Sequence, residues 1–309
     1  MNIEDITSII AGSNVQRVSS GLLSNATSLV SADFSECFFP EVPASCFMEC
    51  DMLSSVTGIC DVSAIGDCAF MECGNLSAVQ FGPDLRVVGT SAFANCGSLS
   101  SFSRFNDGDG SHVFDMVGDR AFAGMPIKTA NLALRSSSIY TFWGDECFAD
   151  CPNLEQVDIL SACYMSNGMF KNCGNLKRVN FRNDHTSYVY PYVFENCTSL
   201  ESITLPSKIW YISEGMFKGC SNLRTVEFNQ YGDGSVMNFV QKYAFNGCRN
   251  LNTIKFPKSL NNISQLEDAC LSNCANNTRP HLYFYGFPKN SLVSVHTPDI
   301  GTLRYGQVI

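Results

Sequence analysis

The sequence predicts a repeat solenoid of stacked parallel short strands, with a short helical turn in each coil. A phenylalanine or leucine recurs eleven times in the 309 residues, at spacings of 22 to 29 residues. Three positions later a small residue follows, mostly cysteine, and an apolar pattern typical of a strand comes next. A period in the twenties is typical of solenoids, in which each coil stacks on the last. The recurring residues are Leu23, Phe47, Phe70, Phe93, Phe122, Phe148, Phe170, Phe194, Phe217, Phe245 and Leu271.

Each coil can be numbered from its recurring residue as position 0. Positions −1, 0 and +3 are apolar or small, as in residues 92–96, and this spacing predicts a helical turn. Positions +6, +9 and +11 are apolar, as in residues 176–181, and their alternation at the end predicts a short strand with one buried face. Position −5 is apolar in all eleven coils, from Val18 to Leu266, and predicts a second, shorter strand.

Three segments follow from where the repeats begin and end. Residues 1–14 form an N-terminal cap, residues 15–284 carry about eleven coils, and residues 285–309 leave the pattern. An amphipathic helix is expected in the first segment, to cover the first coil. Its apolar residues are Ile3, Ile6, Ile9 and Ile10. The last segment is expected either to cap the stack or to attach the chain to another subunit.

Residues 64–81 and 87–102 share one order of residues: a short extended piece, I-G or V-G, then A-F, a cysteine, a leucine and a closing apolar pair. This order resembles the BspA-type leucine-rich repeat family, and the resemblance covers residues 15–284. It implies a right-handed, leucine-rich-repeat-like solenoid. It also implies a family of bacterial and protozoan proteins, many on surfaces and associated with adhesion and host recognition, whose modules also occur in viral and intracellular proteins.

Nine of the sixteen cysteines occupy position +3. Stacking would place their Cβ atoms about one strand spacing apart, near 4.8 Å, which is longer than the roughly 3.8 Å that a disulfide prefers. We therefore expect a column of reduced, buried thiols and assembly in a reducing cytoplasm. The C-x-x-x-C pairs belong to distant coils and cannot combine into a four-ligand zinc site, so neither a metal nor another cofactor is expected. The nine are Cys50, Cys73, Cys96, Cys151, Cys173, Cys197, Cys220, Cys248 and Cys274.

The charge and hydropathy of the chain exclude several partners. A net charge of −9 without clusters of Lys or Arg argues against nucleic acid and anionic membranes. A run of about 18 apolar residues is absent, so membrane insertion is not expected. The N-terminus lacks the basic-then-apolar order of a signal peptide. Synthesis in a reducing cytoplasm is the expectation for localisation, and later display on a cell or virion surface stays open.

The position just before the invariant apolar one is aromatic in five consecutive coils. If position −5 points inward along a short strand, position −6 points outward. Stacked exposed rings can anchor a protein partner or a sugar ring. The alternative is an aromatic ladder that only supports the stack, or rings tucked under the longer loops. The five residues are Phe142, Tyr164, Tyr188, Tyr211 and Phe239, and Tyr190 and Trp210 flank them.

These observations favour a noncatalytic binding or adhesion solenoid. We expect it to recognise a protein or glycan partner through the side surface of its stacked repeats, with the five aromatic residues as its binding site. The alternative is a structural component of a larger assembly, such as a virion decoration or fibre, attached through residues 285–309 or forming a homo-oligomer through them. An enzyme is not expected, because none of the four histidines lies in a recognised catalytic motif.

Overall fold

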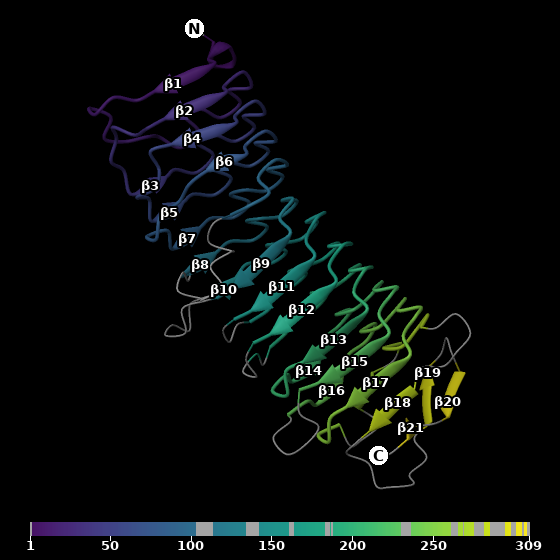
Figure 1. Ribbon diagram of the computed structural model, residues 1–309. Coiled ribbons are helices and arrows are strands. Elements are labelled where there is room, and N and C mark those ends of the chain that lie inside the picture. Colours follow the sequence, from purple (N-terminus) through teal and green to yellow (C-terminus); the bar gives the residue numbers. More distant parts are fainter. Residues whose placement is uncertain are drawn as a thin grey trace. The chain divides into compact units, whose positions relative to one another are not determined.

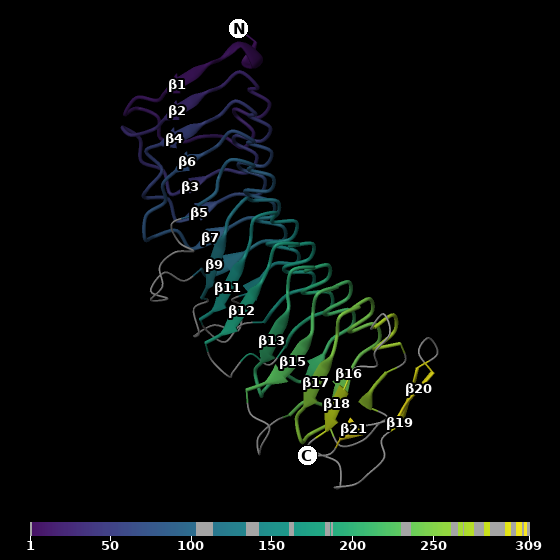
Figure 2. The same ribbon diagram turned by 45° about the vertical axis from the view of Figure 1, so that its right-hand side comes forward.

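Both halves of the chain are stacks of coils with parallel strands, which confirms the predicted repeat solenoid (Figure 1, Figure 2). Contacts divide the chain into two compact units, Met1–Asn153 and Leu154–Ile309. The computed structural model describes residues 2–102, 114–133, 142–160, 164–182, 186, 188–229, 236–260, 265–267, 269–274, 281–284, 294–297, 301–304 and 306–307.

The N-terminal unit contains two ladders of short parallel strands. One has the order β1-β2-β4-β6 and the other the order β10-β8-β7-β5-β3. Val56 of β4 lies opposite Ala32 of β2 and Val79 of β6, so equal coil positions form columns. The elements are η1 (Ile3–Asp5), β1 (Ser8–Ile10), β2 (Ser31–Asp33), β3 (Glu41–Val42), β4 (Ser55–Thr57), β5 (Ala64–Ile65), β6 (Ala78–Val79), β7 (Val87–Val88), β8 (Met116–Val117), β9 (Thr129–Leu132) and β10 (Phe142–Trp143).

The C-terminal unit has its main sheet in the order β13-β15-β17-β18-β21. Strand β11 pairs with β12, β14 pairs with β16, and β19 and β20 form an antiparallel pair. The strands are β11 (Gln156–Ile159), β12 (Arg178–Phe181), β13 (Ser202–Leu205), β14 (Tyr211–Ile212), β15 (Thr225–Phe228), β16 (Phe239–Val240), β17 (Thr253–Phe256), β18 (His281–Phe284), β19 (Ser294–Thr297), β20 (Gly301–Arg304) and β21 (Gly306–Gln307).

A column of stacked phenylalanine rings at position 0 forms the centre of each unit. From Phe47 to Phe148, the ring centroids of successive coils lie 5.2–5.8 Å apart, with interplanar angles of 6–19°. From Phe170 to Phe245 the corresponding values are 5.4–5.8 Å and 9–10°. All of these rings are buried. Because full burial of a phenylalanine contributes about 1.5–3 kcal/mol, this column is a large part of the apolar core.

The helical turn predicted around position 0 takes the form of consecutive tight turns. In one coil, the Ala94 N–H donates to the Ser91 carbonyl and the Cys96 N–H donates to the Phe93 carbonyl. The N–H groups of Phe93 and Asn95 donate instead to carbonyls of the following coil. Ser91 and Asn95 have φ values of 54° and 60°, in the left-handed region. The N–H groups therefore alternate along the segment: one closes a turn within its own coil, and the next bonds to the following coil.

The cysteines at position +3 are hydrogen-bond donors as well as small buried residues. In eight coils the thiol lies 3.0–3.3 Å from the position 0 carbonyl of the preceding coil. The Phe194 carbonyl, for example, accepts the Cys197 N–H of its own coil at 3.1 Å and the Cys220 thiol at 3.0 Å. Both acceptor sites of that oxygen are thus used. The sequence had indicated only the small size of these residues.

The glycines at position −4 of the N-terminal unit allow close approach between coils. Gly66, Gly89, Gly118 and Gly144 directly follow strands β5, β7, β8 and β10, and none has a positive φ. A Cβ added to Gly118 would instead lie 2.4 Å from the backbone nitrogen of Thr90. The absence of a side chain is required because the backbone of the preceding coil fills that space.

The amphipathic helix predicted for the N-terminal segment does not form. The 3-10 helix η1 covers only Ile3–Asp5, and Ser8–Ile10 form strand β1. Ile9 lies opposite Ala32 of the parallel strand β2. Isoleucine is β-branched and favours strands, and the hydrogen bonds offered by the next coil outweigh the helical spacing.

The C-terminal segment extends the sheet of the C-terminal unit. Strand β21 lies parallel to β18, with Leu282 opposite Gly306. A strand added at the end of a stack is the kind of contact that a cap makes. That residues 285–309 either cap the stack or attach the chain to another subunit stays a prediction.

Gly118→Ala is expected to destabilise the protein strongly, by more than about 2 kcal/mol, because its Cβ would meet backbone that cannot give way. Gly97→Ala is the matched control, since a Cβ there would lie 3.6 Å from its nearest neighbour, the Gly74 carbonyl, at ordinary contact distance. Chemical denaturation measures both free energies of unfolding. Equal losses in the two variants would contradict the close-approach role.

Thiol labelling at about pH 8 is expected to separate exposed from column cysteines. Burial raises the pKa of Cys50 to about 11 and the pKa of Cys96 and Cys220 to about 12, so their reactive thiolates are scarce. Cys60 is exposed and should react first. Mass spectrometry after timed alkylation measures the order. A column cysteine that reacts as fast as Cys60 in the native protein would contradict this.

Candidate functional site

The two-residue strands that carry positions −6 and −5 place position −6 outward, as predicted. In β3, β5, β7, β8, β14 and β16 the first residue is exposed or half-buried and the second is buried. In the C-terminal unit, Tyr211 pairs in register with Phe239, and Met165 forms an isolated parallel bridge with Val189, both at position −5. Register therefore stacks the outward side chains of neighbouring coils.

Four of the five predicted aromatic residues join Trp210 in one continuous row, which we call the aromatic stripe. It consists of Tyr164, Tyr188, Trp210, Tyr211 and Phe239. The centroids of Tyr164 and Tyr188 lie 5.3 Å apart, and Tyr188 stacks on Trp210 at 5.7 Å and 25°. Trp210 contacts Tyr211 at 6.4 Å, and Tyr211 stacks on Phe239 at 6.4 Å and 21°.

The stripe is accessible to solvent. Tyr164, Trp210 and Phe239 are 49%, 39% and 41% exposed, and Tyr188 and Tyr211 are half-buried. Tyr190, beside the stripe, is 52% exposed. The inner phenylalanine column, by contrast, is fully covered. The stripe thus combines contacts between its own rings with a solvent-facing aromatic surface.

Phe142 is the predicted site residue that the structure does not join to the stripe. Its backbone lies in β10 of the N-terminal unit, opposite Met116 of β8, and its side chain lies outside the described part of the chain. Trp210 is the member that the pattern named only as a neighbour. It lies one residue before position −6 of its coil, and the prediction considered position −6 alone.

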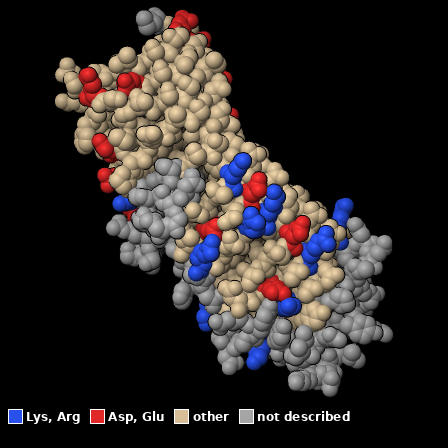
Figure 3. All heavy atoms as spheres, viewed as in Figure 1, with Lys and Arg blue, Asp and Glu red and all other residues tan. Residues whose placement is uncertain are grey.

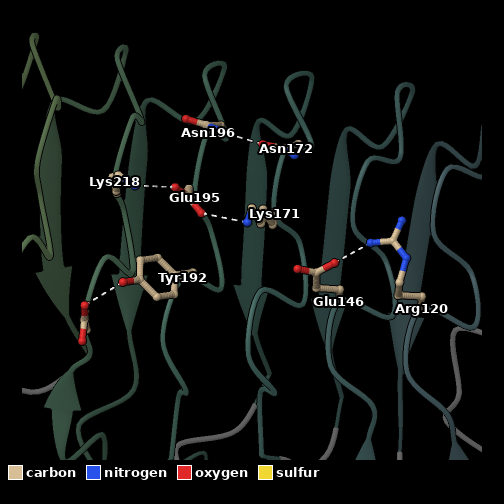
Figure 4. Close-up of polar contacts among 9 residues, drawn as sticks. Arg120, Glu146, Lys171, Asn172, Tyr192, Glu195, Asn196 and Lys218 are labelled. Atoms are coloured by element: carbon tan, nitrogen blue, oxygen red, sulfur yellow. Dashed lines mark hydrogen bonds and ion pairs between the residues drawn. The ribbon is translucent and has the colours of Figure 1, made fainter.

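The turns of the C-terminal unit carry a network of charged and polar side chains between coils (Figure 4). Glu195 lies between two lysines, with its carboxylate 3.3 Å from Lys171 and 2.8 Å from Lys218. Tyr192 donates its hydroxyl to Glu214 at 2.6 Å, and Lys218 lies over the Tyr192 ring. The hydrogen bond to Glu214, with burial as the second cause, raises the pKa of Tyr192 to about 12.

The other contacts in Figure 4 follow the same pattern of one residue per coil. Arg120 pairs with Glu146 in the N-terminal unit, and Asn196 donates its side-chain amide to Asn172 at 2.8 Å in the C-terminal unit. On the strand side, Lys177 lies 3.0 Å from Glu155 on the neighbouring coil. These pairs hold neighbouring coils in register, and cross-strand pairs of this kind contribute about 0.2–1 kcal/mol each.

Charge is divided unevenly between the two units. Residues 1–153 hold 6 Lys and Arg against 18 Asp and Glu, a net of −12, whereas residues 154–309 hold 14 against 11, a net of +3. Figure 3 shows Lys and Arg gathered over strands of the C-terminal unit, while the visible face of the N-terminal unit is largely uncharged. The net charge of −9 therefore conceals a mildly basic C-terminal unit.

Two negative findings apply to the described residues alone. No helix among them has the length and hydropathy needed to cross a bilayer. In the same ranges, no cluster of three or more His, Cys, Asp and Glu side chains is placed to hold a metal ion.

Comparison with known proteins identifies the repeats. The model of the BspA type leucine rich repeat region matches residues 1–108, 110–188 and 234–282, in six copies. No curated protein matches the chain.

Solved structures of leucine-rich repeat proteins resemble the chain. One from Bacteroides ovatus is 19% identical, with 90% of this chain and 88% of that chain covered and a TM-score of 0.40. A leucine rich cell surface protein from Faecalibacterium prausnitzii is 16% identical, with coverage of 90% and 88% and a TM-score of 0.37. The pneumococcal vaccine antigen PcpA is 13% identical, with coverage of 83% and 66% and a TM-score of 0.41.

Tyr192→Phe is expected to lower the free energy of unfolding by about 1 kcal/mol at pH 8, through loss of the bond to Glu214. The raised pKa means that the folded state favours the protonated phenol. The hydrogen bond contributes fully to the free energy of unfolding below about pH 10, the usual pKa of tyrosine. This contribution is lost as the pH rises through about 12. The difference between wild type and variant should therefore shrink from pH 10 to 12, as denaturation curves at each pH would show. A constant difference would contradict the assignment.

Proposed function

This chain belongs to the BspA-type leucine-rich repeat family, and we propose that it is a noncatalytic binding or adhesion module that recognises a protein or glycan through its aromatic stripe. The observation that carries the proposal is a row of five contiguous rings, of which three are exposed and two are half-buried. Solvent-exposed aromatic rows are rare on proteins that only need to fold, because they favour association.

The composition of the stripe supports recognition over simple support of the stack. Tyrosine and tryptophan offer a broad apolar face with a polar group at its edge, which is why they recur at binding hot spots. The inner phenylalanine column already joins successive coils by ring stacking. An exposed second row adds a surface that a partner can cover, and the stacked pair of Tyr188 and Trp210 offers a flat platform for a side chain or a sugar ring.

The backbone that holds the stripe supports the same proposal. Tyr211 and Phe239 lie on paired strands, and their neighbours Ile212 and Val240 are buried in the core. These two rings are thus fixed on a pair of strands. Pre-ordered contacts reduce the entropy lost on binding.

The test is a triple variant, Tyr164→Ser, Tyr188→Ser and Tyr211→Ser, compared with wild type in binding to glycan arrays and to surface proteins of candidate hosts. We expect at least a tenfold loss of affinity for the partner, because hot-spot aromatics contribute about 2 kcal/mol or more each. Circular dichroism and the melting temperature check that the fold is retained.

A matched triple control replaces exposed apolar residues outside the stripe, Phe38→Ser, Met52→Ser and Tyr243→Ser. It should bind as wild type does. A partner held equally by the stripe variant and wild type would exclude the stripe as the binding site and direct attention to residues 285–309.

A further inference from the structure

The strands of two successive coils in the C-terminal unit separate. Strand β12 pairs with β11, whereas β13 belongs to the sheet that continues through β15. On the turn side the same two coils stay joined. Phe170 N–H donates to the Val193 carbonyl at 2.9 Å, and the Phe170 and Phe194 rings stack at 5.8 Å. The two coils are therefore bonded to each other through their turns, whereas β12 and β13 form no strand pair.

One carboxylate draws β12 towards β11. Asp158 of β11 is buried and accepts hydrogen bonds from Gln156, Asn180 and Arg182, at 2.6, 3.1 and 2.9 Å. Burial acts to raise the pKa of Asp158, but these bonds and the charge of Arg182 outweigh it and lower the pKa. Asn180 of β12 and Arg182, which follows that strand, are thus engaged on the β11 side.

A polar hollow occupies the opening between β12 and β13. Hydroxyl and amide groups line it together with the cations of β12. Its polar lining includes Arg178, Asn180, Arg182, Ser202, Thr204 and Asn229. Most of these side chains can donate hydrogen bonds, and the lining contains no carboxylate.

The cationic side chains at the hollow can bind an anion in addition to their present partners. Lys177 pairs with Glu155 at 3.0 Å and Arg182 with Asp158 at 2.8 Å, yet their side chains are 53% and 60% exposed. Arg182 has five N–H donors, of which Asp158 occupies only some. Arg178 also lines the hollow and is exposed.

We propose that this hollow binds an acidic peptide segment in an extended conformation. Carboxylates of the peptide would bond to Arg178 and Arg182, whose guanidinium groups match carboxylate geometry. The lining follows β12 from Arg178 to Phe181 and β13 from Ser202 to Thr204, so an extended ligand lying across the two strands can contact all of it. The net charge of +3 on residues 154–309 favours an acidic partner.

The test uses the full chain and a fluorescent octapeptide of alternating Glu and Thr, with binding measured by anisotropy at low salt. Arg178→Gln is expected to weaken binding about tenfold, the effect of losing one charged hydrogen-bonding group. Arg249→Gln, at an exposed arginine outside the hollow, should bind as wild type does. Hydrogen exchange should show that protection by the peptide is confined to the segments that line the hollow, residues 177–182, 202–204 and 229.

Several outcomes would overturn the proposal. These are no measurable binding, equal weakening by Arg178→Gln and Arg249→Gln, or protection elsewhere in the chain. A sulfated oligosaccharide that protects the same amides more tightly would assign the hollow to an anionic glycan instead. The stripe variant Tyr164→Ser, Tyr188→Ser, Tyr211→Ser should bind the peptide normally, so that failure of the stripe and failure of the hollow are distinguishable.

Discussion

Hydrogen bonds between the turns of successive coils are the interaction on which the rest of the structure depends. Within each unit, successive turns donate alternate N–H groups to the next coil, with left-handed backbone at two positions, as in Ser91 and Asn95. The bonds set the distance between coils and so allow the phenylalanine rings to stack at 5.2–5.8 Å. The thiols at position +3 then use the carbonyl acceptors that remain.

With the turns carrying the contacts between coils, the strand side is free to vary. The polar hollow between β12 and β13 exists although the turns of the same coils stay bonded. Two members of the aromatic stripe, Tyr211 and Phe239, likewise lie on strands of only two residues each, β14 and β16. A rigid column of turns thus supports two surfaces of different chemistry, one apolar and aromatic and the other basic and polar.

Features that depend on one coil could be predicted from the sequence, and features that depend on two could not. Burial of position −5 and exposure of position −6 follow from local alternation, so the outward direction of Tyr211 and Phe239 was predictable. The isoleucines of residues 3–10 fit a helix and a strand equally, and only the neighbouring coil decides. The opening beside β12 depends on three donors that meet at Asp158, which no repeat pattern contains.

The direction of the thiol bonds has a consequence for how such a chain can change in length. Eight column thiols bond to the coil before them, and the coil of Leu23, which has Ala26 at that position, serves only as acceptor. A coil inserted or deleted whole leaves each remaining donor facing an equivalent acceptor, because all coils present the same carbonyl. Stability in such a stack is a sum of nearest-neighbour terms. Evolution can therefore lengthen or shorten it one coil at a time without redesigning its core.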